Sequence, residues 1–216
     1  MKYRLLLLLL LLTASQFLTA QQVLRPFVEH YGDNLVCDNF PAISQDGSHY
    51  LIIYSQYSCC VDLGFSLQKI RSSDGKLLDE IILSPSEEAD EFMVAKQKFI
   101  YEKVKKLLER DNYYTLKEIL KFDQKVDPID NMMYVEVNVS NEVYKSEKFI
   151  LPQVNSHGFC CNGGTDIHEN CLLYQSIVNV SLSVEHKMFL IETGLAQVAD
   201  GCDQGPFYRM IPITKN

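Results

Sequence analysis

The alternation of apolar and polar residues predicts β-structure over residues 40–83. Tyr50 to Tyr54 is an apolar run, and the Asp46-Gly47 pair before it is typical of a hairpin turn because glycine accepts a positive φ. A second hairpin is expected around the turn Ser72-Ser73-Asp74-Gly75. Its two strands are predicted over 65–71 and 76–83.

One long amphipathic helix is predicted next, from about 85 to 110. Ser84-Pro85-Ser86-Glu87 has the pattern of a capping box with proline at the first helical position. Apolar residues then recur at helical spacing. Lysines and an arginine gather toward the C-terminal end, where they suit the helix dipole. The helix is expected to end near Asp111-Asn112.

The chain returns to β-structure from Met132. Met133 to Val139 alternates as a half-buried strand would, and 148–151 is its expected hairpin partner. The segment 113–120 fits a strand or a helix equally well. Further strands are predicted over 176–183, 188–192 and 207–213.

These elements define an α+β fold in a single exported domain, 21–216. Antiparallel sheets form two β-rich halves, 35–83 and 132–213, with the helix at about 85–110 inserted between them. Both halves contain a strand, a tight turn, an apolar strand, a cysteine-bearing loop and a strand. This shared layout suggests an internal duplication. Two unrelated antiparallel meanders are the alternative, because all hairpins are built from the same turn chemistry.

The first twenty residues have the pattern of a secretory signal peptide. Lys2 and Arg4 precede an unbroken leucine run from Leu5 to Leu12, and Ala20 supplies the small residue at the cleavage site. A membrane-spanning helix needs about 20 mostly apolar residues, roughly twice the length of this run. We therefore expect residues 1–20 to be removed and the protein to be secreted or periplasmic.

The chain is acidic, with a net charge of −8 that becomes more negative when Lys2 and Arg4 are removed. An acidic surface repels nucleic acid and anionic lipid at long range. Nucleic acid is therefore not an expected partner, and no membrane insertion is expected after signal cleavage. The pattern identifies no partner or ligand.

Seven cysteines fall on the expected exported domain, and export favours disulfide-braced loops. The odd count leaves at least one thiol free or paired with another chain. Two adjacent Cys-Cys pairs leave the connectivity open. The candidates for disulfide bonding are Cys37, Cys59, Cys60, Cys160, Cys161, Cys171 and Cys202.

The densest group of chemically active residues lies at 157–171. His157 with Cys160, and His168 with Cys171, repeat a His-x-x-Cys spacing that could hold tetrahedral zinc. A cysteine nucleophile with a histidine base is a further alternative. Export favours disulfides over both, so no metal or other cofactor is expected, with zinc as the alternative.

Two resemblances are carried by short motifs. The sequence Phe40-Pro41-Ala42-Ile43-Ser44-Gln45-Asp46-Gly47 resembles the Pro-x-x-Ser-x-Asp-Gly blade motif of TolB-type β-propellers, in which the serine and Asp-Gly shape a turn between two strands. One clear copy is present, whereas a propeller usually has four or more blades, so the resemblance implies the local hairpin alone. The form Ala20-Gln21-Gln22 resembles signal peptides of secreted Bacteroidetes proteins, and the whole chain looks similar to uncharacterised secreted bacterial proteins.

No phosphate-binding glycine loop, Gly-x-Ser-x-Gly elbow or His-Glu-x-x-His motif occurs in the sequence. The sequence therefore favours an exported, non-catalytic domain with a binding or structural role over an enzyme. The alternative is a metal- or thiol-dependent activity centred on 157–171.

Overall fold

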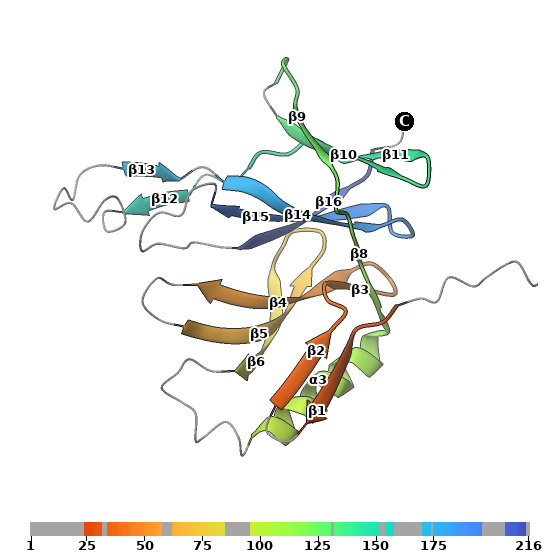
Figure 1. Ribbon diagram of the computed structural model, residues 1–216, viewed down its shortest axis with the longest axis vertical. Helices are drawn as coiled ribbons and strands as arrows, with labels where there is room; N and C mark the ends of the chain where they lie inside the picture. The colour runs from red at the N-terminus through yellow and green to blue at the C-terminus, as the bar shows by residue number, and fades with distance from the viewer. Residues whose placement is uncertain are drawn as a thin grey trace, which may run out of the picture.

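The computed structural model describes residues 24–31, 34–57, 62–84, 96–130, 132–151, 154–157, 170–173, 175–195 and 206–214. They form antiparallel β-sheets and one α-helix, which confirms the predicted α+β class (Figure 1). The expected signal peptide lies outside the described residues. Among the described helices, none is long and apolar enough to cross a membrane.

The described strands form five sheets. The first sheet has the order β6-β5-β4-β3-β7, with bounds Leu77–Ser84, Asp62–Arg71, His49–Tyr57, Ala42–Ser44 and Tyr113–Thr115. The second sheet has the order β16-β15-β14-β8, with bounds Phe207–Pro212, Met188–Leu195, Gln175–Ser183 and Lys117–Glu118. The outer sheet is β11-β10-β9, at Glu142–Lys145, Met133–Val139 and Asp123–Val126. Two-stranded ribbons pair β1 (Phe27–Tyr31) with β2 (Asn34–Asp38), and β12 (Val154–His157) with β13 (Asn170–Leu173).

The first sheet is buried on both faces. Successive residues of a strand point to opposite faces, so Leu51 of β4 packs toward α3 (Gln97–Asp111) while Tyr50 and Ile52 pack toward the second sheet. Ile100 and Val104 of α3 cover the side that carries Leu51. Figure 1 shows the resulting stack, with α3 and the β1–β2 ribbon beside the first sheet.

The second sheet is buried in the same way. Leu190 of β15 contributes to the core shared with the first sheet, while Phe189 and Ile191 pack against the outer sheet. Val135 and Val137 of β10 supply the outer sheet's part of that core. Three apolar cores therefore separate four layers.

The predicted helix is confirmed over Gln97–Asp111, and its expected start at 85–95 lies outside the described residues. Asn112 follows it in the left-handed conformation (φ 51°), a common way to end a helix. The two predicted hairpins of residues 40–83 and the strands at 133–139, 176–183, 188–192 and 207–213 are also found.

One predicted pairing is wrong. The hairpin partner of Met133–Val139 is β11 at Glu142–Lys145, and 148–151 contributes only a bridge from Phe149 to Met133. Ser140 and Asn141 both have positive φ, which makes the tight two-residue turn that brings β11 back so soon.

The segment 113–118, ambiguous in sequence, joins the two central sheets. Its first part, β7, pairs with β3 at the edge of the first sheet, and its second part, β8, pairs with β14 at the edge of the second. Each central sheet therefore begins with an edge strand from this segment, β7 or β8. The two strands of a hairpin follow, β3–β4 or β14–β15, and then a further strand, β5 or β16. The first sheet has β6 in addition. The internal duplication stays a prediction, now with this strand order as its structural basis.

The β3–β4 and β14–β15 turns touch each other. His186 lies in the second turn, and its Nε2 is 3.0 Å from the carbonyl oxygen of Gln45 in the first. Its Nδ1 is 2.9 Å from the hydroxyl of Ser183, so both ring nitrogens are engaged. A Cβ added to Gly47 would lie 2.6 Å from Cδ2 of this ring.

This contact predicts that Gly47→Ala is more destabilising than Gly75→Ala. Both glycines have a φ near 70°, but a Cβ on Gly75 would meet nothing within 4 Å. Gly75→Ala should cost about 1 kcal/mol for the left-handed conformation, and Gly47→Ala about 2–3 kcal/mol because the ring must also move. Urea denaturation measures both values. In a His186→Ala background the two costs should converge, and a persistent difference would contradict the steric explanation.

Candidate functional site

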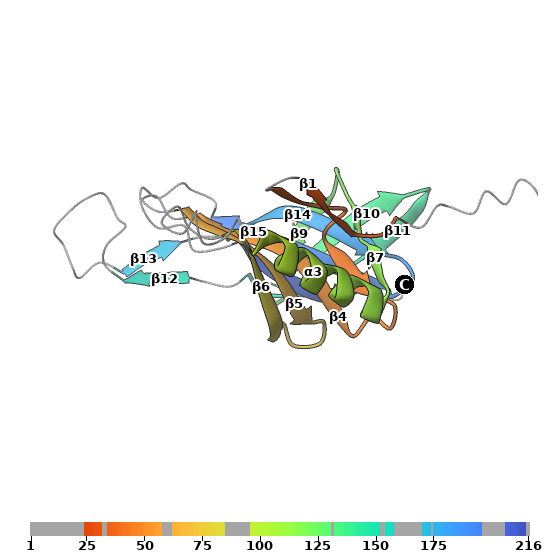
Figure 2. The ribbon, with the colours of Figure 1, turned by 90° about the horizontal axis from the view of Figure 1, so that it is seen from below.

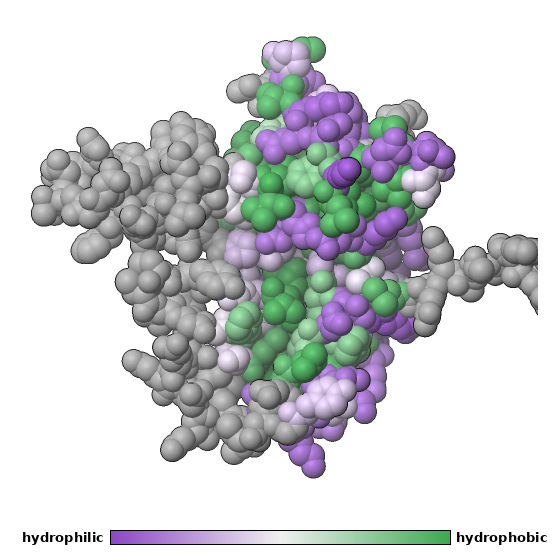
Figure 3. Space-filling view, in the orientation of Figure 1, coloured by the Kyte–Doolittle hydropathy of each residue, from purple (hydrophilic) through white to green (hydrophobic). Residues whose placement is uncertain are grey.

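A cleft of about 350 Å³ opens between the two central sheets and the β2–β3 connection. On the face shown in Figure 3, a hollow with hydrophobic surface at its base lies below a hydrophilic band. The cleft is lined by Cys37, Asp38, Asn39, Phe40, Pro41, Ile52, Ile53, Asn179, Ser181, Leu190, Glu192 and Tyr208. Its lining combines an apolar base with several polar groups, as small-molecule sites commonly do.

Strand β14 supplies the most unusual wall. Val180 and Leu182 pack into the core behind the second sheet, while the alternate positions on the face toward the cleft are Asn179 and Ser181. Ser181 is only 3% exposed. Burying polar groups costs free energy unless they are hydrogen-bonded, so an interface built only for stability would favour apolar residues here.

Glu192 and Tyr208 form a polar pair at the same end of the cleft. They are direct neighbours across β15 and β16, and the tyrosine hydroxyl hydrogen-bonds to the carboxylate. Burial raises the pKa of Glu192, and the nearby Glu118 carboxylate raises it further. Burial and Glu192 also raise the pKa of Tyr208, so the phenol stays protonated and can donate.

The β2–β3 connection forms the opposite wall. Asn39 has a left-handed backbone (φ 64°), and the Phe40–Pro41 peptide bond is cis. The amide of Asn39 donates to the carbonyl of Arg25 at 3.1 Å, and the hydroxyl of Thr115 donates to the carbonyl of Asn39 at 2.9 Å. These bonds hold the connection between the N-terminal ribbon and the first sheet.

Cys37 lines the cleft from β2. Within the part of the chain that the structure describes, its thiol forms no disulfide. Burial raises the pKa of this thiol to about 11, so thiolate is scarce at neutral pH and the group behaves as a small apolar side chain. It packs against the α3 core beside Val28, its neighbour on β1.

Among its described residues, the cleft holds no nucleophile paired with a base. A search of the described residues also finds no group of three or more His, Cys, Asp or Glu side chains able to share a metal. Its donors and acceptors are amide, hydroxyl and carboxyl groups over an apolar base. This chemistry suits a small polar ligand without a strong charge.

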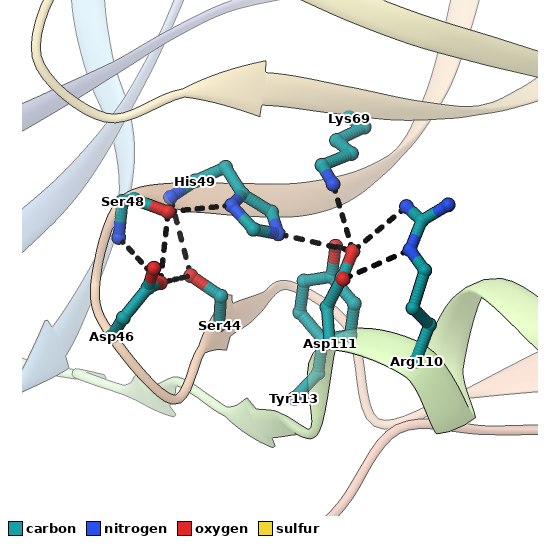
Figure 4. A network of polar contacts seen from close by, with 8 residues as sticks. All are labelled: Ser44, Asp46, Ser48, His49, Lys69, Arg110, Asp111 and Tyr113. Carbon is teal, nitrogen blue, oxygen red and sulfur yellow. Dashed lines mark hydrogen bonds and ion pairs between the residues drawn. The ribbon is translucent and has the colours of Figure 1, made fainter.

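A second polar cluster surrounds Asp111 at the end of α3 (Figure 4). Its Oδ2 accepts a hydrogen bond from Lys69 Nζ at 2.7 Å, and Arg110 reaches both carboxylate oxygens at 2.9 Å. The hydroxyl of Tyr113 donates to Oδ2 at 3.2 Å. The Arg110 guanidinium and the Lys69 ammonium hold the pKa of Asp111 well below its usual range.

Ser48, His49 and Asp111 follow one another in space, as in a hydrolase triad (Figure 4). The hydroxyl of Ser48 donates to Asp46 at 2.8 Å and also lies 2.7 Å from His49 Nδ1. His49 Nε2 lies 3.3 Å from Asp111 without the geometry of a hydrogen bond. A general base needs a bare nitrogen facing the serine proton. Here the Ser48 hydroxyl donates to Asp46, and Asp111 makes no hydrogen bond to the imidazole, so the contacts differ from those of a triad. We therefore describe the cluster by its structural role, as the Asp111 clamp.

The clamp joins the β3–β4 turn to the helix end. Asp46 accepts hydrogen bonds from the hydroxyl of Ser44 at 2.6 Å and from the backbone of Ser48 at 3.0 Å, and these bonds hold its pKa below the usual range. Burial lowers the pKa of His49, and Lys69 adds to the effect. The turn that the sequence predicted from Asp46-Gly47 is therefore fixed by its own side chains.

The cluster predicted at 157–171 is described only at its base. Ribbon β12–β13 places His157 opposite Asn170 and Ser156 opposite Cys171. Cys160, Cys161 and His168 lie outside the described residues, as do Cys59, Cys60 and Cys202. The zinc, thiol and disulfide interpretations of these residues stay predictions.

Sequence reasoning did not identify the cleft. Its residues come from five separated stretches of chain. Among them, Cys37 was singled out as a disulfide candidate and Phe40-Pro41 as part of the blade-like motif, but no sequence pattern connected these residues with one another. The alternation of Asn179 and Ser181 with Val180 was a usable indication of two unlike faces. The alternation alone could not show that the face of β14 with Asn179 and Ser181 is turned toward the first sheet and not toward solvent.

Comparison of the chain with protein-family models, with curated proteins and with solved structures gives no significant match.

The Asp111 clamp predicts a pH-dependent stability. A carboxylate whose folded pKa lies below its unfolded value, about 3.9, stabilises the fold above pH 4 and loses that contribution as pH falls toward the folded pKa. Asp111→Asn should lower the free energy of unfolding by about 2–3 kcal/mol at pH 7. Its disadvantage should shrink between pH 5 and pH 2.

Urea denaturation across this pH range tests the prediction. Asp123→Asn removes an exposed carboxylate on β9 and serves as the control. A deficit in Asp111→Asn that is independent of pH would show that the charge of Asp111 does not act as described.

Proposed function

We propose that this protein is an exported, non-catalytic binding domain whose ligand site is the cleft between its two central sheets. The observation that carries the proposal is the polar wall of Asn179, Ser181, Glu192 and Tyr208 within an interface that is otherwise apolar. Packing of the two sheets against each other does not require polar side chains at these positions, because apolar ones would bury more favourably. Polar side chains at these positions can instead orient a bound ligand.

The surrounding groups favour a ligand that is polar and not strongly charged. Asn179 Oδ1 accepts from the backbone nitrogen of Val180 at 2.7 Å, which leaves its amide NH₂ for another acceptor. The raised pKa of Glu192 makes a full negative charge in the cleft less favourable. Leu190 and Ile52 provide apolar contact beneath these groups. Neutral saccharides and short neutral peptides combine these features.

We also propose that the protein is secreted and that disulfide bonds stabilise it. The leader at 1–20 would deliver the domain to an oxidising compartment, where the cysteines of the loops outside the described residues would pair. Cys37 is the best candidate for the odd thiol, because it packs within a β-ribbon and the α3 core. A metal- or thiol-dependent activity at 157–171 remains the alternative function.

Filling the cleft should abolish binding without unfolding the domain. Ser181→Leu places a larger side chain on the cleft wall, and Val178→Leu changes an exposed position of the same strand as the matched control. Neutral mono- and disaccharides and neutral dipeptides form the test panel in a thermal-shift assay. A ligand at about 100 times its Kd should stabilise the wild type and the control by about 2.7 kcal/mol.

Ser181→Leu should show no such shift with the same compound. Equal stabilisation of both variants would place the ligand elsewhere, and turnover of a bound compound would contradict the non-catalytic assignment.

Counting the free thiols of the purified mature chain tests whether the other cysteines form disulfide bonds. We expect one thiol per chain after denaturation without reductant, no stoichiometric zinc, and no remaining thiol in Cys37→Ser. In the native protein this thiol should react slowly at pH 8, because its pKa is raised to about 11. Four reduced cysteines with one bound zinc would instead support the alternative function.

A further inference from the structure

The outer surface of α3 carries a concentration of positive charge in an acidic protein. The helix buries Ile100, Val104 and Leu107 and leaves its opposite side exposed, and Figure 2 shows α3 on the outside of the molecule. Residues Gln97–Asp111 contain five cationic and three anionic side chains, whereas the whole chain has a net charge of −8. The exposed cations are Lys98, Lys103, Lys105, Lys106 and Arg110.

Three of the exposed residues lie along one side of the helix. Phe99, Lys103 and Lys106 are spaced by four and three positions, which places them above one another on the helix surface. Lys98 and Lys105 lie further round the exposed face, both on the same side of this line, and the exposed Glu102 and Glu109 lie between them and the line. We call Phe99 and these four lysines the helix stripe. Arg110 is not included, because it is paired with Asp111.

The lysines of the helix stripe make no close ion pair in the described residues, although Glu102 and Glu109 lie one helical turn from them. In the described residues, no ion pair within 4 Å involves Lys98, Lys103, Lys105 or Lys106. Lys105 lies over the ring of Tyr101, with its Nζ 5.9 Å from the ring centroid. The four lysines outnumber the two glutamates, so the exposed face of α3 carries a net positive charge.

Phe99 gives the helix stripe its second property. The residue is 71% exposed, although it lies one position before the buried Ile100. A phenylalanine in this position contributes nothing to the α3 core and exposes a large apolar area to water. Single exposed apolar residues are common, but this one lies on a face whose net charge is positive, with Lys98, Glu102 and Lys103 as its neighbours on the helix.

We propose that the helix stripe binds the surface of an anionic membrane. Phe99 enters the boundary between headgroups and acyl chains, and the lysines lie among the lipid phosphates. A basic helix with an aromatic residue is the usual element for such binding. Lysine suits this role because its long apolar stem can lie against lipid while its ammonium reaches the headgroups.

A protein partner fits these side chains less well. Protein interfaces are enriched in arginine and depleted in lysine, and every uncommitted cation of the helix stripe is a lysine. A membrane surface needs no fixed hydrogen-bond geometry, so a compact ammonium serves it as well as a planar guanidinium would.

The negative net charge of the chain does not prevent this contact. The Debye length at physiological ionic strength is about 8 Å, so acidic groups on distant layers are largely screened once the helix lies on the lipid. Net charge still opposes the long-range approach, as expected from the sequence. Binding should therefore need a high density of anionic lipid, and it is independent of the cleft.

Vesicle sedimentation of the mature chain tests the proposal. Vesicles of phosphatidylcholine mixed with phosphatidylglycerol should bind the wild type, while pure phosphatidylcholine should not. Lys103→Glu combined with Lys106→Glu should weaken the partition coefficient at least about tenfold, since each lysine contributes about 1 kcal/mol near an anionic surface. Phe99→Ser should weaken it on the order of tenfold, and Phe99→Leu should retain most of the binding.

The matched control reverses two exposed lysines elsewhere, Lys121→Glu with Lys187→Glu. It has the same net charge as the double helix variant and should bind almost as the wild type does. Equal loss in both variants would show that only net charge matters and would overturn the proposal. Failure of the wild type to bind the anionic vesicles, or retention of polyglutamate instead, would overturn it as well and would favour an acidic protein partner.

Discussion

The contact between the two central sheets is the constraint on which the rest of the structure depends. Ile43, Tyr50 and Ile52 meet Leu190 and Met210 across this interface, and the hydroxyl of Tyr50 reaches the carbonyl of Tyr208 at 3.3 Å. Once the inner face of each sheet is committed to the other, each outer face needs its own cover. The helix and the β1–β2 ribbon cover one, and the outer sheet covers the other. The four layers follow from this requirement, because apolar residues at both odd and even positions of a strand must be buried.

The cleft lies where that contact ends. Along β15 the residue facing the first sheet changes from the buried Leu190 to the half-buried Glu192, and along β16 it changes from Met210 to Tyr208. The sheets need not meet at these positions, because the touching turns at Gly47 and His186 and the segment 113–118 also join them. The segment borders the cleft, since Glu118 of β8 pairs with Ser181. An opening between sheets costs little stability when the junction is held elsewhere. This arrangement lets polar groups remain in the cleft for a ligand.

Local features of the fold could be predicted from the sequence, and the relations between them could not. Asp46-Gly47 and the alternation at 133–139 correctly gave a turn and a strand, because turn chemistry and period-2 burial act over a few residues. The partner of 133–139 was misplaced, since Ser140-Asn141 is a less common tight turn than Asn-Gly. The Asp111 clamp brings together a turn, a strand and a helix end, and the cleft brings together five stretches of chain. No short motif encodes such contacts, because they depend on how layers stack.

The Asp111 clamp also separates the cations of α3 into two groups: Arg110 is paired with Asp111, and the lysines are not. Lys69 and Arg110 are used to neutralise Asp111, whose carboxylate side chain is 18% exposed and fixes the C-terminal end of the helix to the first sheet. The remaining lysines have no such task. If the helix needed cations only to complement its dipole, the benefit would be confined to the last turn. Lys98 and Lys103 lie well before it, and Phe99 between them contributes nothing to the dipole or to the core. The structural role of α3 therefore accounts for its buried face and its C-terminus, and the helix stripe is the part of its surface that folding alone does not explain.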